Sequence, residues 1–165
     1  MSRKAFIEHK IYADWKQLQH QLSVWRFSNR TIIFTNGCFD VLHPGHFHLL
    51  NEAASMAEKP TVVVGLNSDA SVSGLKGKGR PVHRFEDRAL ALASLFAVDA
   101  VIGFDQDTPA ELIDLVQPDI LVKGGDYQIS EIVGADKVLA AGGKVELVSY
   151  LSGHSTTTLI SGDKK

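Results

Sequence analysis

The chain has 165 residues with 17 basic and 19 acidic side chains, so no overall positive field draws it to nucleic acid or to an anionic membrane. Its single cysteine, Cys38, excludes an intramolecular disulfide and is typical of a reducing compartment. Met1 to Lys10 lack the apolar core of a signal peptide, and the longest apolar run, Ala89 to Val98, is about half of what a bilayer crossing needs. We therefore expect a cytoplasmic protein without nucleic-acid or membrane partners.

The first predicted element is an N-terminal helix. Apolar residues recur every three or four positions from Trp15 to Trp25, and Asp14 is placed to cap the helix start. Packing over a sheet, or a subunit interface, is expected of such an apolar stripe rather than catalysis. We predict a helical extension over residues 1–28 and one main domain over residues 29–165.

Five β-prone runs follow, with helical patterns between them. The predicted strands are Thr31 to Phe34, Thr61 to Leu66, Ala100 to Phe104, Ile120 to Val122 and Val145 to Val148. The predicted helices are Phe47 to Ala57, Arg84 to Ala97, Pro109 to Val116 and Ile129 to Ala141. This alternation predicts an α/β fold: a Rossmann-like five-stranded parallel sheet with helices on both faces. The glycines and basic residues from Ser73 to Arg80 show no periodicity and predict a mobile loop.

The most informative segment runs from Thr35 to His46, because it joins the first predicted strand to a helix start. Pro44 suits a first helical position. Unpaired N–H groups and the positive end of the dipole at a helix N-terminus favour a bound phosphate, and Gly45 leaves room for one. His43 and His46 lie three residues apart beside it. The segment therefore predicts a phosphate site.

Residues 43–46 also match a His-x-Gly-His signature. They resemble the nucleotidyltransferase superfamily that includes glycerol-phosphate cytidylyltransferases, phosphopantetheine adenylyltransferases and class I aminoacyl-tRNA synthetases. Further blocks follow in order: Asn67 to Val72, Leu75 to Gly77, Arg80 to Val82, Leu121 to Tyr127 and Ser155 to Thr157. Together they resemble the adenylyltransferase domain that makes ADP-heptose from heptose 1-phosphate, and they imply a nucleotidyltransferase domain over residues 29–165.

The resemblance implies transfer of AMP from ATP to D-glycero-D-manno-heptose 1-phosphate, giving ADP-heptose and pyrophosphate for lipopolysaccharide or other surface glycans. Mg²⁺ is expected to arrive with ATP, because the triphosphate supplies most of its ligands, and no metal site is assigned to the protein itself. A homodimer and a separate upstream sugar kinase are the expected partners. Two alternatives remain open: a cytidylyltransferase acting on glycerol 3-phosphate or another small phosphate, and a non-catalytic nucleotide-binding protein.

The catalytic candidates are His43, His46 and Lys76. An acceptor phosphate is already ionised, so the reaction needs positioning and neutralisation of charge rather than a strong base. Imidazole donors at a helix N-terminus suit this need, and His46 is the stronger candidate for stabilising the transition state. Cys38 beside histidines leaves a nucleophilic thiol or a zinc site as alternatives.

The remaining candidates contact the nucleotide or the second substrate. From the turn and the resemblance, nucleotide contacts are expected from Thr35, Asn36, Gly37, Cys38, Phe39, His43, His46, Lys123, Gly124, Asp126, Ser155, Thr156 and Thr157. Substrate contacts are expected from Asp40, Lys76, Lys78, Arg80 and Arg88. The structural alternatives are a turn cap for Asp40, solvated loop lysines, and an ion pair of Arg88 with Glu86 or Asp87. Relatives place a cation shortly after the Ser-Thr-Thr block, and this chain does not.

Overall fold

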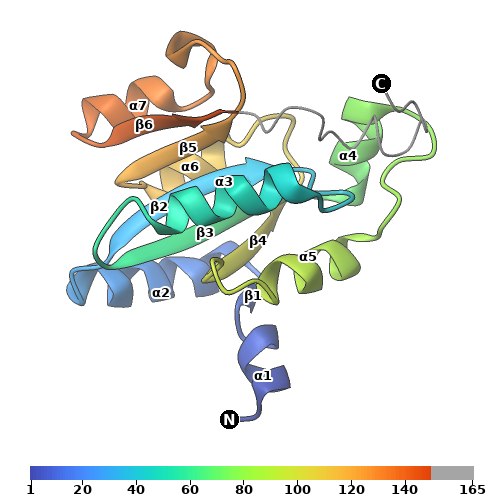
Figure 1. Cartoon of the computed structure of the whole chain (residues 1–165), viewed down its shortest axis with the longest axis horizontal. Helices are drawn as coiled ribbons and strands as arrows, with labels where there is room; N and C mark the ends of the chain where they lie inside the picture. The colour runs from blue at the N-terminus through green and yellow to red at the C-terminus, as the bar shows by residue number, and fades with distance from the viewer. Residues whose placement is uncertain (150–165) are drawn as a thin grey trace.

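A computed structural model describes residues 1–149 and contains one six-stranded sheet in which every pairing is parallel. The order is β1-β4-β3-β2-β5-β6 (Figure 1). The strands are β1 (Ile11–Tyr12), β2 (Thr31–Gly37), β3 (Pro60–Asn67), β4 (Ala100–Phe104), β5 (Ile120–Gly124) and β6 (Lys144–Val148). The parallel α/β fold and the five predicted strands are confirmed. The predicted number of strands is wrong by one, because β1 has only two residues and too short a pattern to show periodicity.

The helices lie between the strands along the chain, except α1, which precedes β1. They are α1 (Arg3–Glu8), α2 (Trp15–Phe27), α3 (Pro44–Ala54), α4 (Asp69–Lys76), α5 (Phe85–Ala93), α6 (Ala110–Val116) and α7 (Ala135–Ala140), with a 3₁₀ turn at Ile129–Glu131. Two predictions are corrected. The expected loop from residue 73 is helical as far as Lys76, because α4 is capped by Ser68, whose Oγ accepts the Ser71 N–H at 3.2 Å. The expected helix over 129–141 is broken, because Gly134 takes a left-handed φ of 81°.

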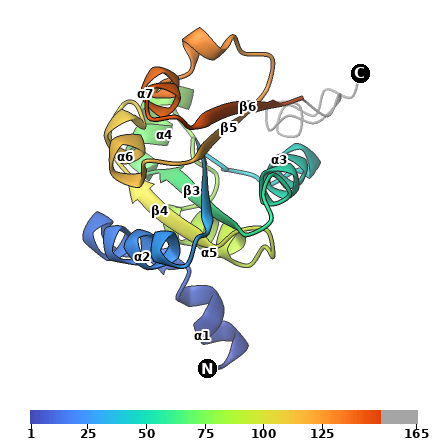
Figure 2. The same cartoon turned by 90° about the vertical axis from the view of Figure 1, so that its left-hand side faces the viewer.

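Helices cover both faces of the sheet. Along β2, Ile33 joins an apolar cluster with α3 and α5, whereas Ile32 and Phe34 join a second cluster with α2, α6 and α7. Figures 1 and 2 show these two layers on either side of the strands. Side chains that alternate along a strand face opposite sides, which is why a strand covered on both faces is apolar throughout. None of the helices in the described part of the chain has the length and apolar character that a membrane crossing requires.

The N-terminal segment packs on the sheet, as its apolar stripe predicted. Leu18 and Leu22 of α2 are fully buried. The Trp15 indole N–H donates to the Gly103 carbonyl at 2.9 Å, and Asp14 caps the helix by accepting the Gln17 N–H at 2.8 Å. Residues 1–28 also contain the strand β1, whereas the sequence predicted a purely helical extension. The division at residue 28 stays a prediction.

The strand order changes direction between β2 and β5. From β2 the chain adds β3 and β4 on one side, then crosses to add β5 and β6 on the other. Pairing of β2 with β5 is confined to Ile33 with Ile120 and Phe34 with Leu121. This change of direction is a topological switch point, and open α/β sheets bind ligands at the carboxyl ends of the strands beside such a point.

Candidate active site

The turn that leaves β2 leads directly into the N-terminus of α3. Phe39 in this turn has a φ of 42°, and Pro44 begins the helix. His43 is the N-cap, because its Nδ1 accepts the Gly45 N–H at 3.2 Å. In a neutral imidazole the second nitrogen then carries the proton, so His43 is the tautomer that can donate from Nε2. The predicted strand, turn and helix start are confirmed, and they place the positive end of α3 beyond the carboxyl end of β2.

The two histidines form one unit at this helix start. Their rings stack with centroids 3.8 Å apart, and the Phe39 ring lies 5.0 Å from His46. Burial, with the neighbouring charges of His43 and Lys76, lowers the pKa of His46 to about 4. His46 is therefore neutral at physiological pH, and its Nδ1 is buried without a hydrogen-bond partner within residues 1–149. A neutral imidazole can donate a hydrogen bond without delivering a proton.

Lys123, near the end of β5, reaches across to β2. Its Nζ donates to Asn36 Oδ1 at the end of β2 over 2.6 Å. Burial lowers the pKa of Lys123 to about 8, against a smaller opposing effect of Cys38. A hollow of about 130 Å³ lies beside this lysine, lined also by Pro109, Tyr127, Glu131, Ile132 and Val133. Two neighbouring residues were also predicted to contact the nucleotide: Gly124 is the last residue of β5, and Asp126 is exposed.

Asp40 is committed to protein donors. Its side chain is buried and accepts the Arg80 Nε at 2.5 Å and the N–H groups of Val82 and His83 at 2.7 and 3.1 Å. Burial alone raises a carboxyl pKa, but these donors outweigh it, so the pKa of Asp40 lies below its usual range. This arrangement favours the structural alternative over direct contact with a substrate.

Arg88 is also held by the protein. Its side chain is fully buried, and its Nε, Nη1 and Nη2 donate to the His83 carbonyl, the Cys38 carbonyl and Asp69 Oδ1 at 3.0, 2.6 and 2.7 Å. The expected alternative of a pair with Glu86 or Asp87 is wrong, because the partner is Asp69. Arg88 thus joins α5, α4 and the β2–α3 turn, and it fixes the carbonyl within the predicted phosphate site.

The basic residues of the α4 region differ in their surroundings. Lys76 is the last residue of α4; its side chain is exposed, and its charge acts on both His46 and Cys38. Lys78 is exposed in the short segment that follows. Sequence reasoning grouped Lys76 with the histidines, and this assignment stays a prediction. It missed Asp69, whose place in the Asn67 to Val72 block was the available signal.

The alternatives for Cys38 are weakened. Burial raises the pKa of its thiol, although the cations Lys76, Arg88 and Arg80 oppose this shift, so the reactive thiolate is disfavoured at neutral pH. Within residues 1–149 no three His, Cys, Asp or Glu side chains come together as a metal site. The candidates Ser155, Thr156 and Thr157 lie outside the described residues.

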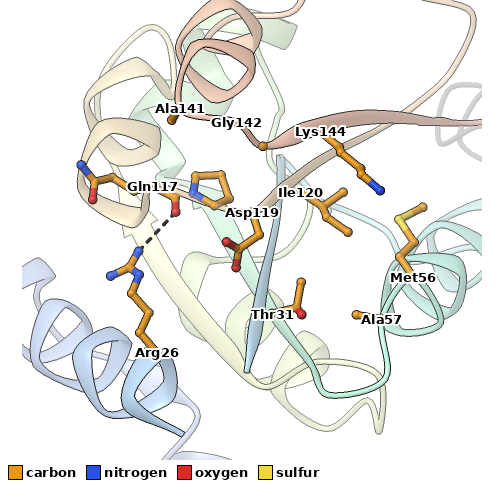
Figure 3. Close-up of a pocket in the computed structure, with 12 residues that line it drawn as sticks. Arg26, Thr31, Met56, Ala57, Gln117, Asp119, Ile120, Ala141, Gly142 and Lys144 are labelled. Atoms are coloured by element: carbon orange, nitrogen blue, oxygen red, sulfur yellow. Dashed lines mark hydrogen bonds between the residues drawn. The ribbon is translucent and has the colours of Figure 1, made fainter. Parts of the chain in front are cut away.

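A second hollow, of about 570 Å³, lies at the opposite end of the sheet (Figure 3). It is lined by residues at or just beyond the carboxyl ends of helices, including Arg26 of α2, Met56 after α3, Gln117 after α6 and Ala141 after α7. Arg26 donates there to the carbonyls of Val116 and Gln117. None of the residues that the sequence predicted for the site lines this hollow.

Comparison with known proteins supports the resemblance. The chain is 50% identical over 153 residues to the "Bifunctional protein HldE" of Nitrobacter hamburgensis, covering 93% of this chain and 31% of that protein. It is 52% identical over 149 residues to the protein of the same name from Caulobacter vibrioides, covering 90% and 30%. The chain therefore spans about a third of the length of these relatives.

A solved structure shares the fold. The lipopolysaccharide core biosynthesis protein from Thermoplasma volcanium superposes with a TM-score of 0.58 at 26% identity, covering 73% of this chain and 96% of that one. The cytidylyltransferase-like family model matches residues 34–159, which include the turn, both histidines and Lys123. The chain belongs to the cytidylyltransferase-like family.

Proposed function

We propose that the protein is an adenylyltransferase that transfers AMP from ATP to D-glycero-D-manno-heptose 1-phosphate, giving ADP-heptose and pyrophosphate. The observation that carries this proposal is the stacked His43–His46 pair at the start of α3, at the same end of the sheet where the Lys123–Asn36 hydrogen bond joins β5 to β2. Neutral donors, a helix N-terminus and a partly buried lysine suit a ligand with several negative phosphate oxygens.

The reaction is a substitution at the α-phosphorus of ATP. An oxygen of the sugar phosphate forms a new P–O bond, the bond to the bridging oxygen of the β-phosphate breaks, and pyrophosphate leaves with that electron pair. No proton has to be removed from the ionised acceptor. His46 donates a hydrogen bond to the charge that builds up in the transition state, His43 and the α3 N-terminus hold phosphate oxygens, and Lys76 neutralises the leaving group.

Magnesium enters this proposal as part of the substrate. Asp40 is occupied by Arg80 and two backbone N–H groups, so it is not placed to collect a free cation. A triphosphate can supply most ligands of Mg²⁺ itself, which fits a protein site built from donors. We propose MgATP as the nucleotide substrate.

The sugar and the cellular setting rest on the relatives. The similar proteins are named bifunctional, and this chain aligns with about a third of their length. We propose that it performs the nucleotidyl transfer, that a separate sugar kinase supplies the sugar 1-phosphate, and that it works as a homodimer in the cytoplasm. The lipopolysaccharide protein among the structural neighbours supports a product used for surface glycans.

A substrate grid tests the proposal. ATP, CTP and GTP are each combined with heptose 1-phosphate, other sugar 1-phosphates and glycerol 3-phosphate, and released pyrophosphate is measured. We expect ATP with heptose 1-phosphate to give the highest kcat/KM. The family description favours one specific alternative, a cytidylyltransferase, and a preference for CTP with glycerol 3-phosphate would establish that function. Nucleotide binding without pyrophosphate release from any pair would instead identify a non-catalytic protein.

A further inference from the structure

Two arginines near the β2–α3 turn are used differently. Arg88 donates from all three of its nitrogens to protein acceptors, so the protein itself accounts for its orientation and its burial. Arg80 donates from Nε to Asp40, but its Nη2 is buried and has no hydrogen-bond partner within residues 1–149. A buried guanidinium N–H without an acceptor is costly, which makes it informative about a ligand.

The orientation of Arg80 is fixed from two sides. Asp40 holds its Nε, and the same carboxylate also accepts N–H groups from the two residues after Pro81. The Arg80 carbonyl accepts the Ser73 Oγ–H of α4 at 2.6 Å. Side chain and backbone are therefore both held, although the neighbouring residues 77–79 are exposed. This is the preparation expected of a ligand-binding group rather than of a solvated surface arginine.

We propose that Arg80 donates from Nη2 to a phosphate oxygen of a bound substrate, and that Asp40 is the positioning residue that orients it. The proposal rests on the proposed nucleotidyl transfer and assigns Arg80 and Arg88 different roles, the second being structural. A phosphate is the ligand indicated, because the turn that carries Asp40 also presents the start of α3 and both histidines. The guanidinium fork matches phosphate oxygens in geometry as well as in charge.

The pairing also predicts how binding depends on conditions. Asp40 offsets the formal charge of Arg80, so this contact acts through a directed hydrogen bond more than through long-range attraction. Its contribution should therefore persist at high ionic strength, unlike that of the exposed Lys78.

The test compares Arg80→Lys, Arg80→Ala and Asp40→Asn in the full chain. Asn keeps an oxygen for the backbone donors but loses the charged acceptor for Arg80. MgATP binding is measured by calorimetry without a sugar phosphate, and KM for each substrate is measured by pyrophosphate release. We expect Arg80→Ala to raise the Kd of MgATP or the KM of the sugar phosphate about 10-fold to 100-fold. The substrate that responds identifies the phosphate that Arg80 binds.

The role of Asp40 is tested by coupling. Asp40→Asn should weaken the same substrate as Arg80→Ala, and the double variant should be no worse than the single Arg80→Ala, because Asp40 acts through Arg80. If the losses of substrate affinity in the two single variants added up fully in the double variant, Asp40 would not act through Arg80. Arg3→Ala, which removes a charge from the exposed helix α1, is the matched control with wild-type affinity.

Arg88→Lys supplies the structural contrast. It should lower Tm, since three acceptors lose hydrogen bonds from a fully buried guanidinium, whereas Arg80→Lys should leave Tm near the wild-type value. Unchanged Kd and KM for both substrates in Arg80→Ala would overturn the inference, even if the wild-type protein releases pyrophosphate as proposed. Failure of the wild-type protein in every substrate pair would count against the proposed function instead, while loss of MgATP affinity in Arg80→Ala would still support the phosphate contact.

Discussion

The two ends of the sheet carry hollows of opposite character. At the amino ends of the strands the space of about 570 Å³ lies beyond the carboxyl ends of α2, α3, α6 and α7. Helix carboxyl ends present carbonyl oxygens and negative partial charge, and Arg26 already donates to two of these carbonyls. At the carboxyl ends of the strands the hollow beside Lys123 is about 130 Å³, and two further hollows of about 560 and 420 Å³ border the end of β4 and the helix α4. Both α3 and α4 begin at this end of the sheet.

Unsatisfied groups distinguish the two ends better than volume does. Within residues 1–149, the buried side-chain atoms without a hydrogen-bond partner are Thr35 Oγ1, His46 Nδ1 and Arg80 Nη2. All three belong to β2, to the start of α3 or to the segment held by Asp40, and none lines the larger hollow. A fold can leave empty space wherever helices end, whereas a buried polar group without a protein partner marks a place that water, an ion or a ligand completes.

The largest expected effect is at His46. His46→Ala should keep its fold and bind MgATP, yet lose a factor of about 10² to 10³ in kcat, or roughly 3 to 4 kcal/mol, as expected for a donor aimed at the transition state. Single-turnover and steady-state kinetics measure this loss. Because the pKa of His46 is about 4, the wild-type enzyme should show no kcat transition from this group between pH 6 and 8.

His48→Ala is the matched control, since His48 lies on the same helix and contacts Glu52 instead of the turn. Its kcat should stay at the wild-type value. If His46→Ala raised only the KM for ATP, His46 would be a ground-state binding residue, and the assigned mechanism would be wrong.

A second, intermediate effect concerns Lys123 and pH. If its ammonium group binds the nucleotide, kcat/KM for ATP should fall by up to about tenfold per pH unit above pH 8, as the proton is lost. Stability should respond in the opposite direction. The unfolded chain holds the Lys123 proton up to the ordinary pKa of 10.5, so between about pH 8 and 10.5 the unfolded state binds more protons and this group makes the folded state more stable as pH rises.

Lys123→Met removes the titrating group and serves as the comparison. The variant should have a low kcat/KM that no longer falls above pH 8. Its free energy of unfolding, measured by urea titration, should lack the rise between about pH 8 and 10.5. An identical alkaline limb in wild type and variant would assign that titration to another group.

The smallest expected effect is at the opposite end of the sheet. Lys144→Ala removes an exposed cation from the larger hollow and should change kcat, KM and the Kd of MgATP by no more than about twofold, because exposed substitutions outside a site have small effects. Calorimetry with MgATP measures this directly. A clear loss of affinity would mean that volume, and not unsatisfied donors, marks the nucleotide site.

Much of the fold could be predicted from local patterns because the central strands β2 to β5 contain nearly continuous apolar runs. The elements that the sequence failed to predict were missed for equally local reasons. Strand β1 is too short to show a pattern. Helix α4 buries only Val72 and contains Gly74, so its sequence resembles a loop. Gly134 interrupts a segment whose apolar residues otherwise continue at helical spacing. A sequence pattern identifies a long run of apolar residues at helical spacing, but not the single residue at which the helix is interrupted.

The site divides in the same way. The β2–α3 turn is contiguous, so its residues and their chemistry could be predicted together. The network around it depends on contacts between residues far apart in the chain: Arg88 reaches Cys38 and Asp69, which lie 50 and 19 positions away. Residue type alone made Arg88 a substrate candidate, and only the packing of α5 against the turn shows that the protein already uses its nitrogens.

The short pairing between β2 and β5 also creates an edge inside the sheet. After Phe34 and Leu121 the ladder between these two strands stops, although β2 remains paired with β3 and β5 with β6. Unpaired strand edges attract other chains, and natural sheets commonly protect them with a lysine. Lys123, bonded to Asn36 across the gap, meets that description. The side chain proposed to bind the nucleotide therefore also bridges the place where the β2–β5 ladder stops, so one lysine serves both the sheet and the proposed site.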